Sequence, residues 1–225
     1  MVKDMKKEKR KRPRQWVTRV LLAMMAFLLL STSDSYAQVL TAQQKQAIQR
    51  RVKNKVEEFQ FYLEQLGDRQ FTNKQMRNEA YASALKLFVG NGDDYRVYDP
   101  YREAYIVKSA VRIETSSKYN SHIGKKTVKA YMRNLKNDAS YSQIVIESAG
   151  AVVVDDIYQV GDHYECMAYF CQKYISYREG KISYSDITEK KVRVRIEKIE
   201  IPRADGTTKT FWNALLGDIY VVSTR

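Results

Sequence analysis

The stretch that decides the fold runs from His163 to Ile201 and reads HYECMAYFCQKYISYREGKISYSDITEKKVRVRIEKIEI. Tyr, Phe, Val, Ile and Thr dominate both of its halves, and these residues fit the pleated surface of a strand. Arg178-Glu179-Gly180 lies between the halves, and its glycine can adopt the positive φ of a hairpin turn. The stretch therefore predicts a long β-hairpin at the centre of a curved antiparallel sheet.

A three-residue loop at this turn fixes the expected pairing, in which Tyr177 pairs with Lys181 and Tyr164 with Val194. Successive side chains of a strand point to opposite faces, so the even-numbered residues form one largely apolar face. We expect this face to pack on helices. The opposite face is mixed in character, and its expected pairs are Met167 with Lys191, Tyr169 with Glu189 and Cys171 with Ile187.

The mixed face leaves two interpretations open. It is an ordinary solvent-exposed face, since over half of a typical protein surface is apolar. Alternatively, a second copy of the chain, an envelope protein or a ligand covers it. Under the second interpretation the binding residues are Met167, Tyr169, Cys171 and Ile187.

Both cysteines of the chain, Cys166 and Cys171, belong to this hairpin. Because they are five residues apart on one strand, they point to opposite faces and lie about 16 Å from each other. A disulfide needs Cα atoms within about 7 Å, so we do not expect these cysteines to pair. Cys166 is expected to be a small core residue.

The residues before the hairpin predict helices. Thr41 and Gln44 form a capping box for a first helix, whose apolar residues recur every three or four positions, with Gly67 as the left-handed residue beyond its end. A second helix is expected from about Thr72 to Phe88, and a third from Lys125 to Lys136. The first helix should bury its apolar stripe against the sheet.

The rest of the chain predicts strands, over residues 104–115, 143–147, 151–160, 208–216 and 219–224. Grouped helices followed by grouped strands are typical of an α+β domain. The predicted architecture is three N-terminal helices packed on a strongly curved antiparallel sheet of four to six strands.

The N-terminus has the three parts of a secretory signal peptide. Residues 1–19 are basic, Val20 to Leu30 is an apolar run too short to span a bilayer, and Ser35-Tyr36-Ala37 supplies small residues before a cleavage site. We expect cleavage between Ala37 and Gln38, which leaves residues 38–225 as a single periplasmic or extracellular domain. The membrane would be contacted only through the signal peptide during export, and an uncleaved anchor is the alternative.

The charge of the chain is concentrated in that leader. The whole chain carries a formal net charge of +13, but residues 1–37 hold nine Lys or Arg and three Asp or Glu, so the remainder carries +7. In the remainder both signs are mixed without a long block of one sign. This pattern, like the export signal, argues against a nucleic-acid partner.

The sequence lacks the motifs of common cofactor and catalytic sites, and His122 and His163 stand in no cluster of metal ligands. We therefore expect no cofactor and no metal. The best catalytic candidates are Asp99, Tyr101, Tyr105 and His122, because a carboxylate beside a Tyr donor can abstract a proton where burial shifts their pKa values. Alternatively, Asp99 begins a turn before a proline and His122 is a loop residue.

The order of elements and one short motif resemble the nuclear transport factor 2-like superfamily. The motif is Gly124-Lys125-Lys126-Thr127-Val128-Lys129-Ala130-Tyr131-Met132, which is similar to the short helix that this family places before its long strands. The resemblance covers about Leu40 to Thr224 and implies a cone of helices closed by a strongly bent antiparallel sheet.

The superfamily includes isomerase-like and dehydratase-like enzymes as well as non-enzymatic binding and dimerisation modules. Its enzymes place Asp, His or Tyr inside the cone, and the resemblance implies that Asp99, Tyr101 and Tyr105 could occupy such places. No residue here matches an enzymatic motif closely, and one fold supports many functions.

We expect an exported, non-catalytic binding or protein-interaction domain of the bacterial cell envelope, which forms a homodimer or binds an envelope protein through the mixed face. A small ligand is also possible. Two alternatives stay open: an isomerase or dehydratase that uses the interior of the cone, and an envelope glycan binder that stacks sugars on some of its 17 Tyr.

Overall fold

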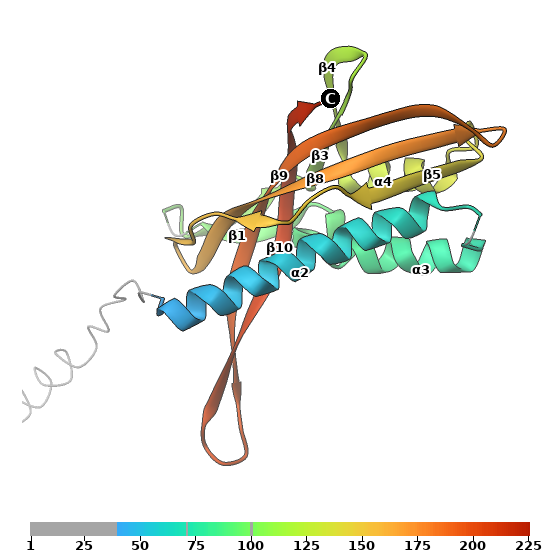
Figure 1. The fold of residues 1–225 in the computed structure, drawn as a ribbon. Helices are drawn as coiled ribbons and strands as arrows, with labels where there is room; N and C mark the ends of the chain where they lie inside the picture. Colours follow the sequence, from blue (N-terminus) through green and yellow to red (C-terminus); the bar gives the residue numbers. More distant parts are fainter. Residues whose placement is uncertain (1–39, 71, 100) are drawn as a thin grey trace, which may run out of the picture. The chain divides into compact units, whose positions relative to one another are not determined.

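The predicted hairpin stands at the centre of an eight-stranded sheet in the part of the chain that the structure describes (Figure 1). The computed structural model describes residues 40–70, 72–99 and 101–225, of which Leu40–Arg225 form one compact unit. The predicted signal peptide and its cleavage site at Ala37-Gln38 lie outside the described residues. Strands β8 (His163–Arg178) and β9 (Lys181–Pro202) pair antiparallel and confirm the hairpin.

The turn of the hairpin is one residue shorter than predicted. Arg178 pairs with Lys181, so the loop holds only Glu179, with a φ of 51°, and Gly180, with a φ of 75°. Two consecutive residues at positive φ are typical of a type I′ turn, whose twist matches that of the flanking strands.

A bulge next to the turn changes the pairing further, since Tyr177 pairs with Ile182 but Ser176 pairs with Tyr184. As a result, each residue of β8 beyond the bulge pairs two positions further along β9 than predicted. An offset of two leaves every side chain on its predicted face, because side chains alternate with a period of two. The division into an apolar and a mixed face is therefore preserved.

Glu179 offers a test of this turn. A residue with an ordinary side chain is disfavoured in the left-handed region by about 1 kcal/mol, whereas Asn tolerates it and is preferred in type I′ turns. We expect Glu179→Asn to raise the free energy of unfolding by about 0.5 kcal/mol in urea titrations. Lys181→Asn, just outside the turn, is the control, and an equal gain in both variants would contradict the explanation.

The long helix α2 (Ala42–Gly67) crosses the inner face of the sheet (Figure 1). Its capping box is confirmed, since the Thr41 amide donates to Gln44 Oε1 at 2.8 Å and the Gln44 amide donates to Thr41 Oγ1 at 3.2 Å. The helix buries its predicted stripe, which consists of Ile48, Val52, Val56, Phe59, Leu63 and Leu66.

Gly67 has a different role from the predicted one. It is the last residue of α2 rather than a left-handed residue beyond it, and the chain continues through an extended Asp68. A Cβ on Gly67 would lie 2.7 Å from the carbonyl oxygen of Ile144 in β5 (Gln143–Ser148). The glycine is therefore needed because the helix and the strand approach each other closely.

Helix α3 (Lys74–Leu85) is capped by Asn73, whose Oδ1 accepts a hydrogen bond from the Met76 amide at 2.9 Å. It ends before the predicted Phe88, because there the chain turns through the 3-10 segment Val89–Gly92 and joins the sheet. In this connection the amide of Leu216 donates to the carbonyl of Leu87 at 2.8 Å.

Helix α4 (Val128–Asn137) corresponds to the third predicted helix but starts three residues later. Residues 125–127 instead complete strand β4 (Asn120–Thr127), and the Thr127 side chain caps the helix. Since α4 follows four strands, the prediction of three N-terminal helices is wrong in that respect. Within the described residues, no helix is long and apolar enough to cross a membrane.

The strands form two sheets. Strands β1 (Tyr95–Asp99) and β2 (Ala104–Lys108) make a separate two-stranded sheet. The large sheet has the order β4-β3-β10-β9-β8-β5, with β6 and β7 also paired to β8, and its remaining members are β3 (Arg112–Ser117), β6 (Val153–Val154), β7 (Tyr158–Val160) and β10 (Thr208–Thr224). Every pairing is antiparallel except that of β3 with β10.

The predicted number of four to six strands is too low for three reasons. The predicted strand 104–115 breaks at residues 109–111 and supplies one strand to each sheet. The predicted loop 116–124 contains most of β4, and the predicted strand 151–160 splits into two short strands. In contrast, the two predicted C-terminal strands merge, because β10 continues through a bulge at Gly217 and Asp218.

The apolar core lies between the inner face of the sheet and the helices. Phe59 of α2 contacts Phe88 edge to face, with ring centroids 5.2 Å apart. The inner face supplies Cys166, Ala168 and Phe170 from β8 and Val192, Val194 and Ile196 from β9. Cys166 is fully buried and unpaired, and Cys171 lies on the other face, as predicted.

Candidate functional site

The core-facing side of β9 changes from apolar to polar along the strand. Beyond Val192, toward the β8–β9 turn, the same face continues with Lys190, Thr188, Asp186 and Tyr184. Strand β8 changes one position later, since the residues that pair with these four are the apolar Phe170 and then Gln172, Tyr174 and Ser176. The sheet thus presents polar side chains at positions where the alternation predicts core residues.

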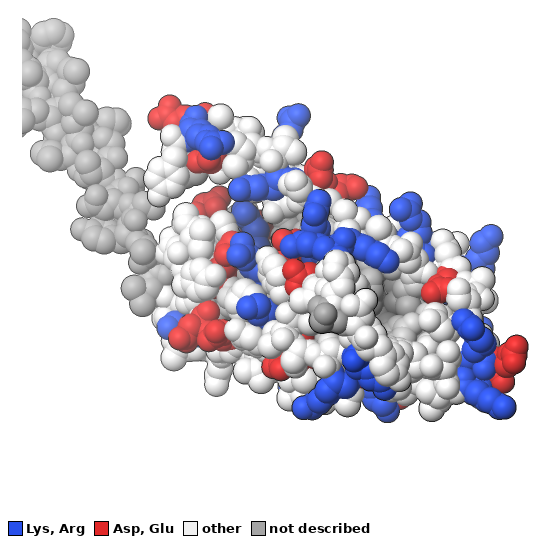
Figure 2. Space-filling view, turned by 90° about the horizontal axis from the view of Figure 1, so that it is seen from above, with Lys and Arg blue, Asp and Glu red and all other residues white. Residues whose placement is uncertain are grey.

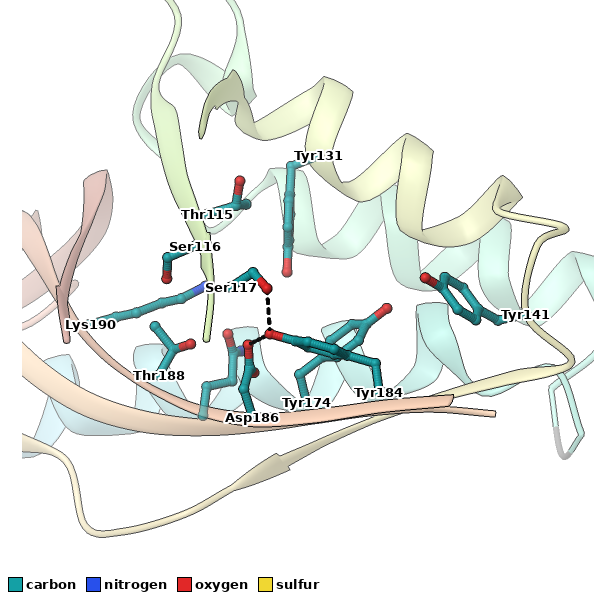
Figure 3. Close-up of a pocket in the computed structure, with 11 residues that line it drawn as sticks. Thr115, Ser116, Ser117, Tyr131, Tyr141, Tyr174, Tyr184, Asp186, Thr188 and Lys190 are labelled. Atoms are coloured by element: carbon teal, nitrogen blue, oxygen red, sulfur yellow. Dashed lines mark hydrogen bonds between the residues drawn. The ribbon is translucent and has the colours of Figure 1, made fainter. Parts of the chain in front are cut away.

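The polar half of this face is not filled by side chains from the helices. A hollow of about 330 Å³ lies over it, at the small end of the range of ligand sites. Figure 3 shows its walls, with α4 on one side and the sheet on the other. We call it the polar pocket, and its lining residues are Thr115, Ser116, Ser117, Tyr131, Tyr141, Gln172, Tyr174, Tyr184, Asp186, Thr188 and Lys190.

Lys190 is the least compensated charge in the polar pocket. Its side chain is buried, with an exposed fraction of 4% for the residue. Among the described residues, Nζ has no hydrogen-bond acceptor and no carboxylate within 4.0 Å, and it lies 5.7 Å from the centroid of the Tyr131 ring. Burial lowers the pKa of Lys190 to about 8, although the negative charge of Asp186 opposes the shift.

Tyr184 and Asp186 form the hydrogen-bonded centre of the pocket floor (Figure 3). The Tyr184 hydroxyl donates to the Asp186 carboxylate and lies 3.0 Å from Ser117 Oγ, while the amide of Lys118 donates to it at 3.1 Å. Burial raises the pKa of Asp186, against the opposing effects of the Tyr184 hydrogen bond and the Lys190 charge. The Asp186 carboxylate is therefore a hydrogen-bond acceptor whose burial is only partly offset by the Tyr184 hydrogen bond and the Lys190 charge.

Three tyrosines of the pocket, Tyr131, Tyr174 and Tyr184, are hydrogen-bond donors at neutral pH. Burial raises the pKa of Tyr131 to about 12, and it also raises the pKa values of Tyr174 and Tyr184. Each ring therefore combines an apolar face with a protonated hydroxyl.

Gln172 carries an unsatisfied donor next to the hollow. The residue has an exposed fraction of 4%, and its Nε2 has no hydrogen-bond partner within the described part of the chain. Ser176 Oγ, on the same face of β8, is also buried and unpaired there. Leaving a buried amide unpaired costs about 1 to 3 kcal/mol, which an acceptor on a ligand would recover.

The four predicted catalytic residues do not line the polar pocket. Asp99 accepts a hydrogen bond from the Tyr101 amide at 3.0 Å and lies 3.6 Å from Arg102 Nε, as a residue at a turn would. Tyr101, in the turn between β1 and β2, and Tyr105, on β2, have exposed fractions of 98% and 72%. His122 is exposed on β4, in the other sheet.

The predicted binding residues of the mixed face are together, on the outer side of the sheet. Each is half-buried and pairs with a charged residue of the neighbouring strand; the pairs are Met167 with Arg193, Tyr169 with Lys191, Cys171 with Glu189 and Ile187 with Lys173. The aliphatic stems of long charged side chains can cover apolar neighbours while the charges stay in water. This arrangement accounts for the mixed pattern in the sequence.

Charge on the surface is mixed as well. Figure 2 shows Lys and Arg side chains interspersed with Asp and Glu side chains over the face in view. Among the described residues, no group of three or more His, Cys, Asp or Glu is arranged to hold a metal ion.

Sequence reasoning missed the polar pocket, although a signal was present. Residues 184, 186, 188 and 190 share the parity of the core residues 192, 194 and 196, yet all four are polar. A run of polar residues on the core-facing side of a long strand indicates either a solvent-exposed end of the strand or a polar interior. Here the run lies under α4, which corresponds to a polar interior.

Comparison with known proteins found no match: no family model, no curated protein and no solved structure matches the chain.

Proposed function

We propose that the protein is a small-molecule-binding protein whose polar pocket holds an uncharged, hydroxyl-bearing ligand of about the size of a monosaccharide. The observation that carries the proposal is the change of the core-facing side of β9 from apolar to polar over an unfilled hollow. A buried lysine and an unpaired buried amide both reduce stability. Sequences break the rules of core packing mainly at functional sites.

The donors and acceptors of the pocket suit a polyhydroxylated ligand. Lys190 and the Gln172 amide can donate hydrogen bonds, Asp186 can accept them, and the Ser, Thr and Tyr hydroxyls can do either. The tyrosine rings offer apolar faces against which the C–H groups of a sugar can pack. One carboxylate and one amine give the lining little net charge, which favours a neutral ligand over a charged one.

The size of the hollow sets an upper limit on the ligand. Its volume of about 330 Å³ corresponds to about 11 water molecules at ~30 Å³ each. A single small sugar or polyol fits this volume, whereas a longer glycan would have to extend out of the pocket. If the protein binds a glycan, the pocket therefore holds one sugar unit of it.

The resemblance to the nuclear transport factor 2-like superfamily supports an interior site. The motif that carries the resemblance, residues 124–132, spans the end of β4 and the start of α4 and includes Tyr131, a lining residue of the pocket. An enzyme of this kind would have to use Asp186 and Tyr184, because Asp99, Tyr101, Tyr105 and His122 lie elsewhere.

The proposed location is outside the cytoplasm, on the strength of the leader pattern in residues 1–37. There the protein would bind a sugar of the cell envelope or of the surroundings. A homodimer or an envelope partner on the face around Met167, Tyr169, Cys171 and Ile187 stays a prediction from the sequence.

Isothermal titration calorimetry with a panel of monosaccharides and polyols tests the proposal. We expect at least one of them to bind, and Gln172→Leu to weaken its binding about tenfold, since one hydrogen bond to a buried group is worth about 1 to 2 kcal/mol. The variant should fold, because it removes an unpaired buried amide.

Thr210→Val is the control, since Thr210 is an exposed residue of β10 that lies outside the pocket lining. It should bind the same ligand with unchanged affinity. Absence of binding across the panel, or binding that Gln172→Leu leaves unaltered, would contradict the proposed function.

A further inference from the structure

We infer that Lys190 binds its ligand covalently and reversibly: the pocket accepts a short hydroxyaldehyde, such as the open-chain form of a small aldose, as an imine on Nζ. The inference rests on the proposed function, because it requires the ligand to occupy the polar pocket. It adds the chemical class of the ligand and the atom to which it is attached.

The position of the amine is the first reason. In Figure 3 the Lys190 side chain extends from β9 along the pocket, with its nitrogen toward Ser117 and the Tyr131 ring. Within the described ranges no carboxylate lies within 4.0 Å of this nitrogen. Buried ammonium groups are normally paired, because an unpaired one is strongly disfavoured by desolvation. We therefore expect this unpaired amine beside the pocket to be neutral for part of the time.

The protonation equilibrium supports the same conclusion. With a pKa of about 8, about a tenth of the amine is neutral at pH 7, whereas an ordinary lysine has almost no neutral form. A neutral, desolvated lysine is the form that attacks carbonyl carbons. Lys191, the next residue, points to the outer face and has none of this environment.

The reaction needs no oxidant, reductant or metal. The lone pair of the neutral amine attacks the aldehyde carbon, so a C–N bond forms, the C=O π bond breaks and the oxygen takes up a proton. The nitrogen then loses a proton to water. The resulting carbinolamine expels its hydroxyl group as water with one added proton, and the nitrogen lone pair completes the C=N bond. From the neutral amine, the net change is the uptake of one proton and the loss of one water molecule, which gives the protonated imine, and hydrolysis reverses it.

The surroundings favour the product. A protonated imine is a cation, and it would form where the ring of Tyr131 lies 5.7 Å from Nζ and where the charge of Asp186 is felt. The hydroxyls of the ligand would meet the unpaired Gln172 amide and the Thr188 side chain along the same face.

The charge of the pocket favours a neutral hydroxyaldehyde over a 2-oxo acid. A 2-oxo acid would bring a carboxylate into a pocket that already holds the buried Asp186, whose pKa is raised. Once Lys190 has become the imine, the pocket offers no second basic side chain among its lining residues. A neutral hydroxyaldehyde avoids this repulsion, and its hydroxyls use the donors and acceptors that a simple alkyl aldehyde would leave unpaired.

Reductive trapping tests the inference. The purified protein is incubated with glyceraldehyde and sodium cyanoborohydride at pH 7.5, and peptide mass mapping locates the reduced adducts. We expect Lys190 to be modified at least tenfold faster than any other lysine, with a rate that rises with pH around a midpoint near 8. Lys190→Met should abolish the fast phase, and the matched control Lys191→Met should keep it.

Comparison reagents test the ligand class. Pyruvate and propionaldehyde, used at the same concentration, should modify Lys190 at least fivefold more slowly than glyceraldehyde. Equal rates for propionaldehyde would show a reactive lysine without recognition of hydroxyls and would overturn the class. Modification spread evenly over the lysines, or absent from Lys190, would overturn the covalent bond.

The outcome separates this inference from the proposed function. If a polyol or sugar binds in a Gln172-dependent manner but no adduct forms at Lys190, the pocket binds its ligand without a covalent bond and only the inference fails. If neither binding nor an adduct is found, both fail.

Discussion

Lys190→Met should make the protein more stable, by about 1 to 3 kcal/mol at pH 7. At this pH the folded protein holds a mostly charged amine in a buried position, and a methionine of similar length removes that cost. The loss of attraction to Asp186 offsets part of the gain, but Asp186 keeps its hydrogen bond from Tyr184. Urea unfolding measures the change, and in thermal unfolding it should appear as a rise of a few degrees in Tm.

The pH dependence gives this prediction a second test. The pKa of Lys190 is about 8 in the folded protein and about 10.5 in the unfolded chain. Between these values the unfolded chain holds a proton that the folded protein has released, so the Lys190 contribution to the free energy of unfolding increases with pH. Below about pH 8 both states are protonated and this contribution is flat.

The variant isolates this contribution. The difference in stability between Lys190→Met and the parent should be largest below pH 8 and should shrink toward pH 10.5. Lys191→Met, the neighbour on the outer face, should change stability by no more than about 0.5 kcal/mol at any pH in this window. A loss of stability in Lys190→Met at pH 7 would show that the amine is compensated and would remove the argument for a neutral lysine.

Phe170→Ala should have the largest destabilising effect, about 3 to 5 kcal/mol. Phe170 has an exposed fraction of 2% and pairs with Lys190 across the hairpin. It is the last large apolar residue on the core-facing side of β8 before the polar half begins. Truncation removes buried apolar surface and leaves a cavity that cannot collapse onto the rigid sheet.

Tyr169→Ala is the matched control for this variant, because Tyr169 is the adjacent residue on the outer face and is only half-buried. Urea unfolding should give a loss of about 1 kcal/mol or less for the control. Similar losses for both variants would mean that the two faces of the hairpin are equally buried, contrary to the structure.

The parts of the fold that the sequence predicted are those in which local pattern and burial agree. The capping box at Thr41 and the stripe of α2 specify one helix, and alternation along residues 163–201 specifies one buried face. The parts that it did not predict depend on neighbours distant in sequence. Gly67 is set by the approach of Ile144, and the end of α3 by pairing to β10.

The site was harder to predict for a physical reason. Asp99, Tyr101, Tyr105 and His122 are residue types that often carry chemistry, but their position relative to the polar pocket depends on how β1, β2 and β4 pack. In the sequence, Lys190 and Asp186 resemble ordinary charged residues of a strand, because no neighbouring residue shows that α4 and β3 cover them.

The single extra residue beside the β8–β9 turn also bears on how this chain can change over time. Ser183 has no partner in the ladder, since Ile182 pairs with Tyr177 and Tyr184 with Ser176. Between Tyr184 and Lys190, a deletion or insertion of one residue that no second bulge absorbs would exchange the two faces, replacing Lys190 inside by Lys191 or Glu189. Insertions or deletions of two residues would keep the same face buried and would place a different pair of side chains under α4. Away from the unpaired Ser183, viable length variants of this strand should therefore differ in steps of two, which would change the side chains under α4 while the core stays the same.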